Sequence, residues 1–401
     1  MQKIKNFIFS GKFLFNTNLA IFLWFGFALF ASAQGLLSNN FNNFTIFKYS
    51  YSHIASHQNL YLLYPKEYYD AYMYGPTFTV LIAPFTFLPN SIALILWGLL
   101  NASLLYFAIR QLPIKQEYQN AILILASNEL LNTISHHQFN AIVAACIILG
   151  FTYINKGKDF IALLFIVFAT ITKIYGIVGF SFFFFSRTKL KFIVSTIFWF
   201  AFFFILPVFI TSFSFLLQSY KDWFDALVFK SHKNVTINED VFFQDISVMG
   251  FIRRNFNTHF NKDAIVLFFA AIIFLSKYIQ HKFFNDIRYR LYFLCSVLLF
   301  VVIFSTSSES PTYIIAFPAC CLWLVLQPAS KMANAVFLFC LAFTSFSNSD
   351  IFGSYVRSFS VHHSIRVLPC FVLWVIIIIQ IHTKQFLQTD LNNGLKLRFV
   401  K

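Results

Sequence analysis

Three carboxylates are placed where they could carry out acid–base chemistry: Glu67, Asp70 and Glu309. Glu67 and Asp70 share one tyrosine-rich polar segment, whereas Glu309 stands between Ser308 and Ser310 at the edge of an apolar run. A carboxylate at such an edge is costly unless it is paired or hydrated, and it acts as a general base when it reaches a hydroxyl. Each also has a structural interpretation, as a solvated loop acid or, for Glu309, as a charge at a helix N-terminus.

Several cations and polar side chains are suited to an anionic or hydroxylated ligand. Lys173 ends an apolar run, where an ammonium group either meets an anion or extends to the headgroups. Arg253 and Arg254 stand together in a long polar segment and suit a phosphate or an anionic membrane surface. His137 and Gln138 could bind hydroxyls or phosphate, or form a polar interface between helices. Neighbouring side chains on a helix diverge by about 100°, so adjacent histidines cannot chelate alone, and we expect no metal and no cofactor.

Long apolar runs must position these residues. Hydrophobic residues make up 58% of the 401 and charged residues 11%, so a soluble domain would expose far too much apolar surface. Helices in lipid satisfy their own backbone hydrogen bonds. We expect an all-α polytopic membrane protein, one domain over residues 1–401, with about twelve transmembrane helices, some of which must borrow polar flanks to cross. The apolar runs fall at 18–35, 90–109, 118–132, 139–155, 159–172, 174–186, 192–214, 264–279, 291–306, 311–327, 332–346 and 367–382.

Basic residues predict which side of the membrane each loop occupies. Lys3, Lys5 and Lys12 precede the first run and place the N-terminus in the cytoplasm. Alternation from there puts most of the 30 Lys and Arg inside and most carboxylates outside, with two long outer loops at 36–76 and 215–262. We expect a multi-pass protein of the inner (cytoplasmic) membrane with both termini cytoplasmic and its active site on the outer, periplasmic side. The net charge of +15 then indicates contact with anionic lipid headgroups, so no nucleic-acid partner is expected.

Two local patterns refine this picture. Aromatic and apolar residues recur at helical spacing from Asn42 to His53, which predicts an interfacial helix in the first outer loop. Pro84 and Pro89 limit the next apolar stretch to a short, half-buried helix. The six cysteines all fall in apolar runs and are expected to be small packing residues.

An ordered series of short motifs covers most of the chain. It consists of Asn43-Phe44, Leu60-Tyr61, Tyr74-Gly75-Pro76, Ala83-Pro84, Leu88-Pro89, Leu96-Trp97, Leu100-Asn101, His137-Gln138-Phe139-Asn140 and Lys173-Ile174-Tyr175-Gly176. In this order they resemble the polyprenol-phosphate-dependent mannosyltransferases of glycosyltransferase family 87, in the GT-C superfamily. The resemblance implies a GT-C-like helical bundle and transfer of a sugar, by default mannose, from a polyprenyl-phosphate donor to a lipid-linked or glycan acceptor hydroxyl. Such transfer inverts the anomeric centre and serves cell-envelope glycan biosynthesis.

The resemblance also implies roles for residues, with one departure. The acid that the family carries in its first outer loop falls on Asn43, and an amide cannot accept a proton as a base. We therefore expect the base among Asp70, Glu67 and Glu309, with Asp70 first because it lies closest to the Tyr-x-Pro motif. The side chains expected to bind substrate are Asn43, Tyr61, Tyr74, His137, Gln138, Lys173, Tyr175, Arg253, Arg254 and Tyr313. A flippase of lipid-linked sugars and a catalytically inactive relative are the alternatives, the second because of Asn43.

Overall fold

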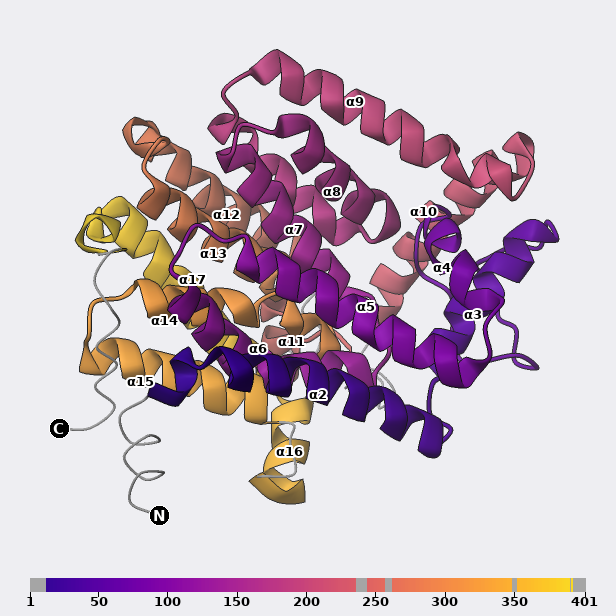
Figure 1. Ribbon diagram of the computed structural model, residues 1–401, viewed down its shortest axis with the longest axis horizontal. Helices are drawn as coiled ribbons and strands as arrows, with labels where there is room; N and C mark the ends of the chain where they lie inside the picture. Colours follow the sequence, from indigo (N-terminus) through magenta and orange to yellow (C-terminus); the bar gives the residue numbers. More distant parts are fainter. Residues whose placement is uncertain (1–11, 236–243, 257–261, 348–351, 390, 392–401) are drawn as a thin grey trace. The chain divides into compact units, whose positions relative to one another are not determined.

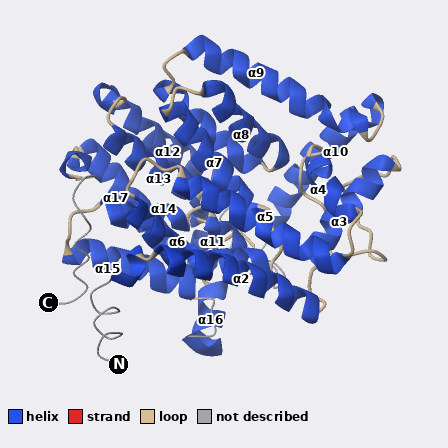
Figure 2. Ribbon diagram, viewed as in Figure 1, coloured by secondary structure: helices blue, strands red, loops and turns tan. Residues whose placement is uncertain are grey.

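The computed structural model describes residues 12–235, 244–256, 262–347, 352–389 and 391. Within these ranges the chain is helical and contains no strand (Figure 2). Each apolar run predicted from the sequence coincides with one or more helices. The two chain ends, which were expected in the cytoplasm, and part of the second outer loop lie outside the described residues.

The chain divides into two compact units. Unit 1 comprises Met1–Phe27, Ile109–Leu130 and Asn234–Lys401, and unit 2 comprises Ala28–Ala108 and Leu131–Lys233. The helices that continue from one unit into the other are α2 (Thr17–Leu37), α5 (Asn90–Arg110), α6 (Gln116–Ser135) and α10 (Phe213–Val235). The expectation of a single domain stays a prediction.

Unit 2 is built around a buried helix, α7, with α8 and η2 packed against it. Next to α8 lies α9, with which it runs side by side (Figure 1). The helix predicted at Asn42 to His53 is confirmed as α3, and it packs against the short α4, which contains Pro84 and ends before Pro89. The helices that lie wholly in unit 2 are α3 (Asn42–Ala55), α4 (Phe78–Thr86), α7 (Asn140–Asn155), α8 (Asp159–Thr172), η2 (Ile174–Phe185), α9 (Lys189–Ile205) and η3 (Leu206–Phe209).

Unit 1 centres on α13, which packs against α14 and α17. Side-chain caps fix several helix starts, because they satisfy N–H groups that have no partner inside the helix. Ser330 Oγ accepts from the Ala333 N–H, and Asp286 Oδ1 accepts from the Arg288 N–H at 2.8 Å. The helices that lie wholly in unit 1 are η1 (Lys12–Phe15), α11 (Val248–Asn255), α12 (Asp263–Ser276), η5 (Lys277–Phe283), α13 (Ile287–Ile303), η6 (Ser310–Ile314), α14 (Phe317–Leu326), α15 (Lys331–Cys340), η7 (Leu341–Phe346), α16 (Gly353–His362), α17 (Val367–His382) and η9 (Gln385–Gln388).

Among the described helices, four stretches are long and apolar enough to cross a membrane: Thr17–Leu37, Asn90–Arg110, Lys189–Phe209 and Asp263–Phe283. The pair α16 and α17, bent by 60°, makes a fifth if it forms one span. About twelve spans were expected, and that number is not confirmed. The remaining apolar runs are broken into shorter helices, and an upright span needs roughly 20 residues.

Side-chain exposure agrees with a membrane protein. Many large apolar side chains along α9 and α12 are exposed, as with Ile197 (64% exposed) and Phe268 (61% exposed). Contiguous apolar surface of this extent is typical of contact with lipid rather than water. The six cysteines are all buried and free, and Cys320 and Cys370 lie 4.0 Å apart at their sulfurs, within the packed part of unit 1.

Candidate active site

A break between two helices of unit 2 positions the central cation of the candidate site. Helix α8 ends at Thr172, Lys173 takes an extended conformation (φ −145°, ψ 108°), and η2 begins at the next residue. The Gly75 N–H donates to the Thr172 carbonyl at 2.9 Å, which satisfies one of the last acceptors of α8. A Cβ on Gly75 would lie 1.9 Å from the Ile171 carbonyl oxygen. The Tyr-x-Pro motif therefore rests backbone to backbone against this break, and only glycine fits there.

Three neutral groups surround the Lys173 ammonium. Its Nζ donates to Asn140 Oδ1 at 2.6 Å and lies 5.2 Å from the Tyr74 ring centroid and 5.3 Å from that of Tyr175. Asn140 is fully buried, and its Nδ2 donates to Gln138 Oε1 at 2.5 Å. The structure thus brings together four of the predicted binding residues, joined by Asn140, which belongs to one of the quoted motifs but was not among the predicted binding residues.

His137 is packed in the protein interior and does not face the residues around Lys173. It adopts a left-handed conformation (φ 52°), is buried, and its Nε2 lies 3.1 Å from the Asn40 carbonyl. Its own carbonyl accepts from Trp97 Nε1 at 3.0 Å. Burial lowers the pKa of His137 to about 4. A Cβ on Gly35 would lie 2.5 Å from the imidazole, so this ring fills space beside α2.

The two asparagines at the start of α3 bind backbone. Asn43 Nδ2 donates to the His136 carbonyl at 2.9 Å. Asn42 makes two bonds with Tyr69, donating to its carbonyl at 2.6 Å and accepting from its N–H at 2.8 Å. An ionised aspartate has no N–H to donate, so it could not make the bonds that Asn42 and Asn43 donate to these two carbonyls. The amide at the family's acid position therefore has a structural use here.

Glu67 forms a pair with a buried histidine. His53 Nε2 lies 2.8 Å from Glu67 Oε2, and the histidine is 1% exposed. The imidazole is 4.0 Å from the Tyr64 ring centroid, and Tyr68 and Tyr49 lie near it. Its Nδ1 has no hydrogen-bond partner among the described residues. A bare lone pair there costs less than a buried N–H, so the geometry favours the tautomer in which Nε2 carries the proton and donates it to the carboxylate.

The Glu67 carboxylate is still partly open to solvent, with its side chain 31% exposed. Asp70, by contrast, is exposed and has a left-handed backbone conformation (φ 72°), and its Oδ1 accepts from the N–H of Ala71. Tyr61, in the same loop, donates from Oη to the Tyr74 carbonyl at 3.0 Å. Within this loop, Glu67 is the carboxylate that a second side chain orients.

The family comparison covers much of this arrangement. The model of glycosyltransferase family 87 matches residues 72–306, more than half of the chain. The chain belongs to glycosyltransferase family 87. No curated protein matches it. The matched part of this family 87 glycosyltransferase includes Tyr74, Lys173 and Tyr175, while Asn43 and Glu67 lie ahead of it in the sequence.

The arginines predicted to bind substrate lie in unit 1 and are engaged by protein groups. Arg253 is 1% exposed and forms ion pairs of 2.5 Å with both Asp245 and Asp263. Burial raises the pKa of Asp245 to about 6, although the positive charge of Arg253 opposes that shift. Arg254 donates to the carbonyl of Gln244 at 2.5 Å and also to the hydroxyl of Ser364. These contacts anchor α11. That Arg253 and Arg254 bind substrate stays a prediction.

Glu309 and Tyr313 of the enzyme also have structural partners in unit 1. Glu309 forms a capping box with Thr312 at the start of η6, the helix N-terminal role that was its alternative interpretation. Tyr313 is fully buried and donates to the Ile246 carbonyl at 3.0 Å. Its ring lies 5.1 Å from the Arg366 guanidinium carbon.

A buried ion pair between Glu129 and Arg366, 2.7 Å apart, was missed by the sequence reasoning. Both side chains are almost completely buried, and 237 residues separate them along the chain. The sequence did contain a signal for this pair, because Glu129 stands inside an apolar run, where an ionised group requires a partner. His53 gave a similar signal, because helical spacing places it on the buried face of α3 with Phe47 and Ser50. In the described residues no three His, Cys, Asp or Glu side chains cluster as metal ligands.

Proposed function

We propose that the enzyme transfers mannose from a polyprenyl-phosphate donor to a hydroxyl of a lipid-linked or glycan acceptor. The observation that carries this proposal is the helix break at Lys173, flanked by Tyr74 and Tyr175. An ammonium held at the end of an apolar helix is suited to a phosphate at headgroup depth, where a lipid-linked donor presents it. The phenol rings beside it stabilise the cation.

In this proposal Glu67 is the general base. Its Oε2 is held by His53, which leaves Oε1 to take the proton of the acceptor hydroxyl. The acceptor oxygen then bonds to the anomeric carbon from the side opposite the phosphate, the carbon–oxygen bond to phosphate breaks, and its electron pair leaves with the polyprenyl phosphate. One attack from the opposite side inverts the anomeric centre. Lys173 stabilises the departing phosphate.

The charge distribution supports an outer-face site in the inner membrane. Positive residues favour the cytoplasmic side, and the alternation that follows from Lys12 puts both the first loop and Lys173 outside. A lipid-linked donor needs no nucleotide, which suits an extracytoplasmic reaction. Side-specific labelling of cysteines introduced at positions 66 and 158 tests this arrangement, because the two are predicted on opposite sides.

The test is sugar transfer by the purified enzyme from radiolabelled polyprenyl-phosphate mannose. Lys173→Met should lower kcat/KM by about 10²–10³-fold and Glu67→Gln by about 10²–10⁴-fold, the ranges for one electrostatic donor and one general base. The matched controls are Lys66→Met and Asp70→Asn, exposed changes in the same unit that should leave transfer nearly unchanged. If Asp70→Asn abolishes transfer and Glu67→Gln does not, the base is Asp70 and the proposed dyad is wrong.

A flippase of lipid-linked sugars is the second candidate, and one observation favours it. Transporters bind their substrates at discontinuous helices, and α8 and η2 form such a helix around Lys173. Reconstitution in vesicles separates the two functions. Movement of polyprenyl-phosphate mannose between leaflets without transfer to any acceptor would support the flippase, whereas transfer abolished by Glu67→Gln supports the enzyme.

A further inference from the structure

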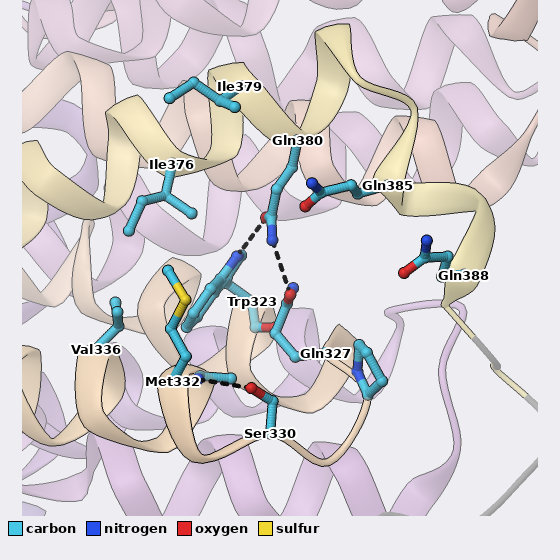
Figure 3. Close-up of a pocket in the computed structure, with 12 residues that line it drawn as sticks. Trp323, Gln327, Ser330, Met332, Val336, Ile376, Ile379, Gln380, Gln385 and Gln388 are labelled. Atoms are coloured by element: carbon cyan, nitrogen blue, oxygen red, sulfur yellow. Dashed lines mark hydrogen bonds between the residues drawn. The ribbon is translucent and has the colours of Figure 1, made fainter.

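A cavity of about 350 Å³ lies in unit 1, apart from the residues assigned to sugar transfer (Figure 3). Helices α14, α15 and α17 and the short η9 form its walls. It lies at the C-terminal end of α17, whereas Arg366 and its partner Glu129 lie at the N-terminal end, about 20 Å away along the helix axis. The residues that line it are Trp323, Gln327, Pro328, Ser330, Met332, Ala333, Val336, Ile376, Ile379, Gln380, Gln385 and Gln388.

A chain of hydrogen bonds fixes one wall. Trp323 Nε1 donates to Gln380 Oε1 at 2.8 Å, and Gln380 Nε2 donates to Gln327 Oε1 at 2.9 Å (Figure 3). Gln327 Nε2 continues the chain to Tyr292 Oη at 2.8 Å. An amide offers two N–H donors and two acceptor lone pairs, so Gln380 keeps one of each after these bonds. The wall therefore holds oriented amides with hydrogen-bonding capacity to spare.

Two further amides reach the cavity from η9. The side chains of Gln385 and Gln388 extend toward it in Figure 3, and both residues are exposed. Between them Phe386 is fully buried and contacts the rings of Phe283 and Tyr289, which fixes η9 against the unit. The mouth of the cavity thus carries two amides on a fixed turn, and their exposed side chains are accessible to a ligand.

The opposite side of the cavity is apolar. Met332 is 69% exposed and Ile379 is 52% exposed, and Val336 and Ile376 lie between them along α15 and α17. Such exposed apolar side chains on two apolar helices suit an acyl or isoprenoid chain. No lining residue carries an ionisable side chain, so a charged headgroup inside the cavity would be desolvated without a counter-ion.

We propose that this cavity binds an uncharged amphiphile, a lipid alcohol whose hydroxyl head contacts the Gln380, Gln385 and Gln388 amides while its chain follows the groove between α15 and α17. A hydroxyl both donates and accepts, as the amides do. The cavity volume is at the small end for ligand sites, so it holds the head and the first carbons of the lipid. The charged polyprenyl-phosphate donor would meet no cation among the residues that line the cavity, so we treat this site as separate from the one for sugar transfer.

The test compares lipids that differ in the headgroup, using the full-length protein in detergent micelles and native mass spectrometry. Dioleoylglycerol should bind at least tenfold tighter than dioleoylphosphatidate, which carries the same chains and one added phosphate. A long-chain polyprenol provides a further arm that distinguishes an isoprenoid alcohol from a glycerolipid, and preference for either alcohol supports the site. Equal or tighter binding of phosphatidate overturns the proposal.

Two variants locate the binding. Ala333→Phe places a ring in the cavity and should abolish alcohol binding, and the double change Gln385→Leu with Gln388→Leu should weaken it about tenfold, as expected for the loss of two neutral hydrogen bonds. The double change affects only exposed side chains, so it stays informative if Ala333→Phe fails to fold. Gln58→Leu, an exposed glutamine of unit 2, is the matched control. Alcohol binding that survives the double change at full strength would also overturn the proposal.

Discussion

Gly75→Ala tests whether the helix break that holds Lys173 depends on one close backbone contact. The added methyl carbon would lie 1.9 Å from the Ile171 carbonyl oxygen and 3.1 Å from Trp223 Cη2. Neither α8 nor the Tyr-x-Pro segment can yield by a side-chain rotation, since the nearest atom belongs to the backbone. The segment must retreat from α8 by about 1.5 Å to reach ordinary van der Waals contact.

That retreat has two costs. The Gly75 N–H donates to the Thr172 carbonyl at 2.9 Å, and a shift of this size breaks the bond and leaves a helix-end acceptor unsatisfied, at about 1 kcal/mol. Overpacking in a closely packed region costs about 1–3 kcal/mol more. We therefore expect the free energy of unfolding to fall by about 2–4 kcal/mol. Because Lys173 follows Thr172 directly, transfer should fall with stability.

Thermal unfolding of the detergent-solubilised enzyme measures the first effect, and kcat/KM for transfer measures the second. The matched control is Gly26→Ala in α2, where nothing lies within 4 Å of the added carbon. In a helix interior that change should stabilise by about 0.5–1 kcal/mol. If the two alanine variants melt at the same temperature, the close contact at Gly75 does not exist as described.

Three further predictions concern buried polar groups. Glu129→Gln should cost about 3–5 kcal/mol because it leaves Arg366 buried without its charge partner, whereas the double variant Glu129→Leu with Arg366→Met should recover most of that loss in chemical denaturation. Asn43→Asp should cost about 1–3 kcal/mol and leave transfer no faster, since a carboxylate cannot donate to the His136 carbonyl; a gain in transfer would contradict this. His137 has a pKa near 4 when folded and near 6.5 when unfolded, so the unfolded chain binds more protons between these values and stability falls as pH drops through that window. Melting temperatures at pH 7 and pH 5 should show a smaller loss for His137→Phe than for the unaltered enzyme.

Apolar periodicity predicted the helices but not the contacts between them. The runs at 159–172 and 174–186 were separated correctly, because a single lysine interrupts them. The function of that interruption depends on Gly75, which approaches the break from a segment about 100 residues earlier in the chain. Hydropathy reports the composition of a segment and carries no information on such contacts. Among the described helices, four or five are long and apolar enough to cross a bilayer, so the expected number of about twelve spans stays a prediction.

Some residues of the candidate site were likewise predicted from the sequence, and others were not. Tyr74, Lys173 and Tyr175 were predicted from motif order and lie together in the structure. Asn140 and His53 were not predicted, since their importance comes from the atom that each one faces. Which of several loop carboxylates acquires a fixed partner is decided by tertiary packing and not by residue type.

The arginines and Lys173 differ in what a phosphate would have to displace. Arg253 already faces two carboxylates, so an incoming phosphate would meet their repulsion or replace a charge-assisted bond that is worth more than a neutral one. At Lys173 the amide oxygen of Asn140 and the two phenol rings carry no net charge, and a phosphate that took the place of Asn140 would exchange a neutral hydrogen bond for an ionic one. These contacts favour a phosphate at the lysine over one at the arginine. Donor binding should therefore depend on Lys173 far more than on Arg253, whose replacement should act through the stability of α11.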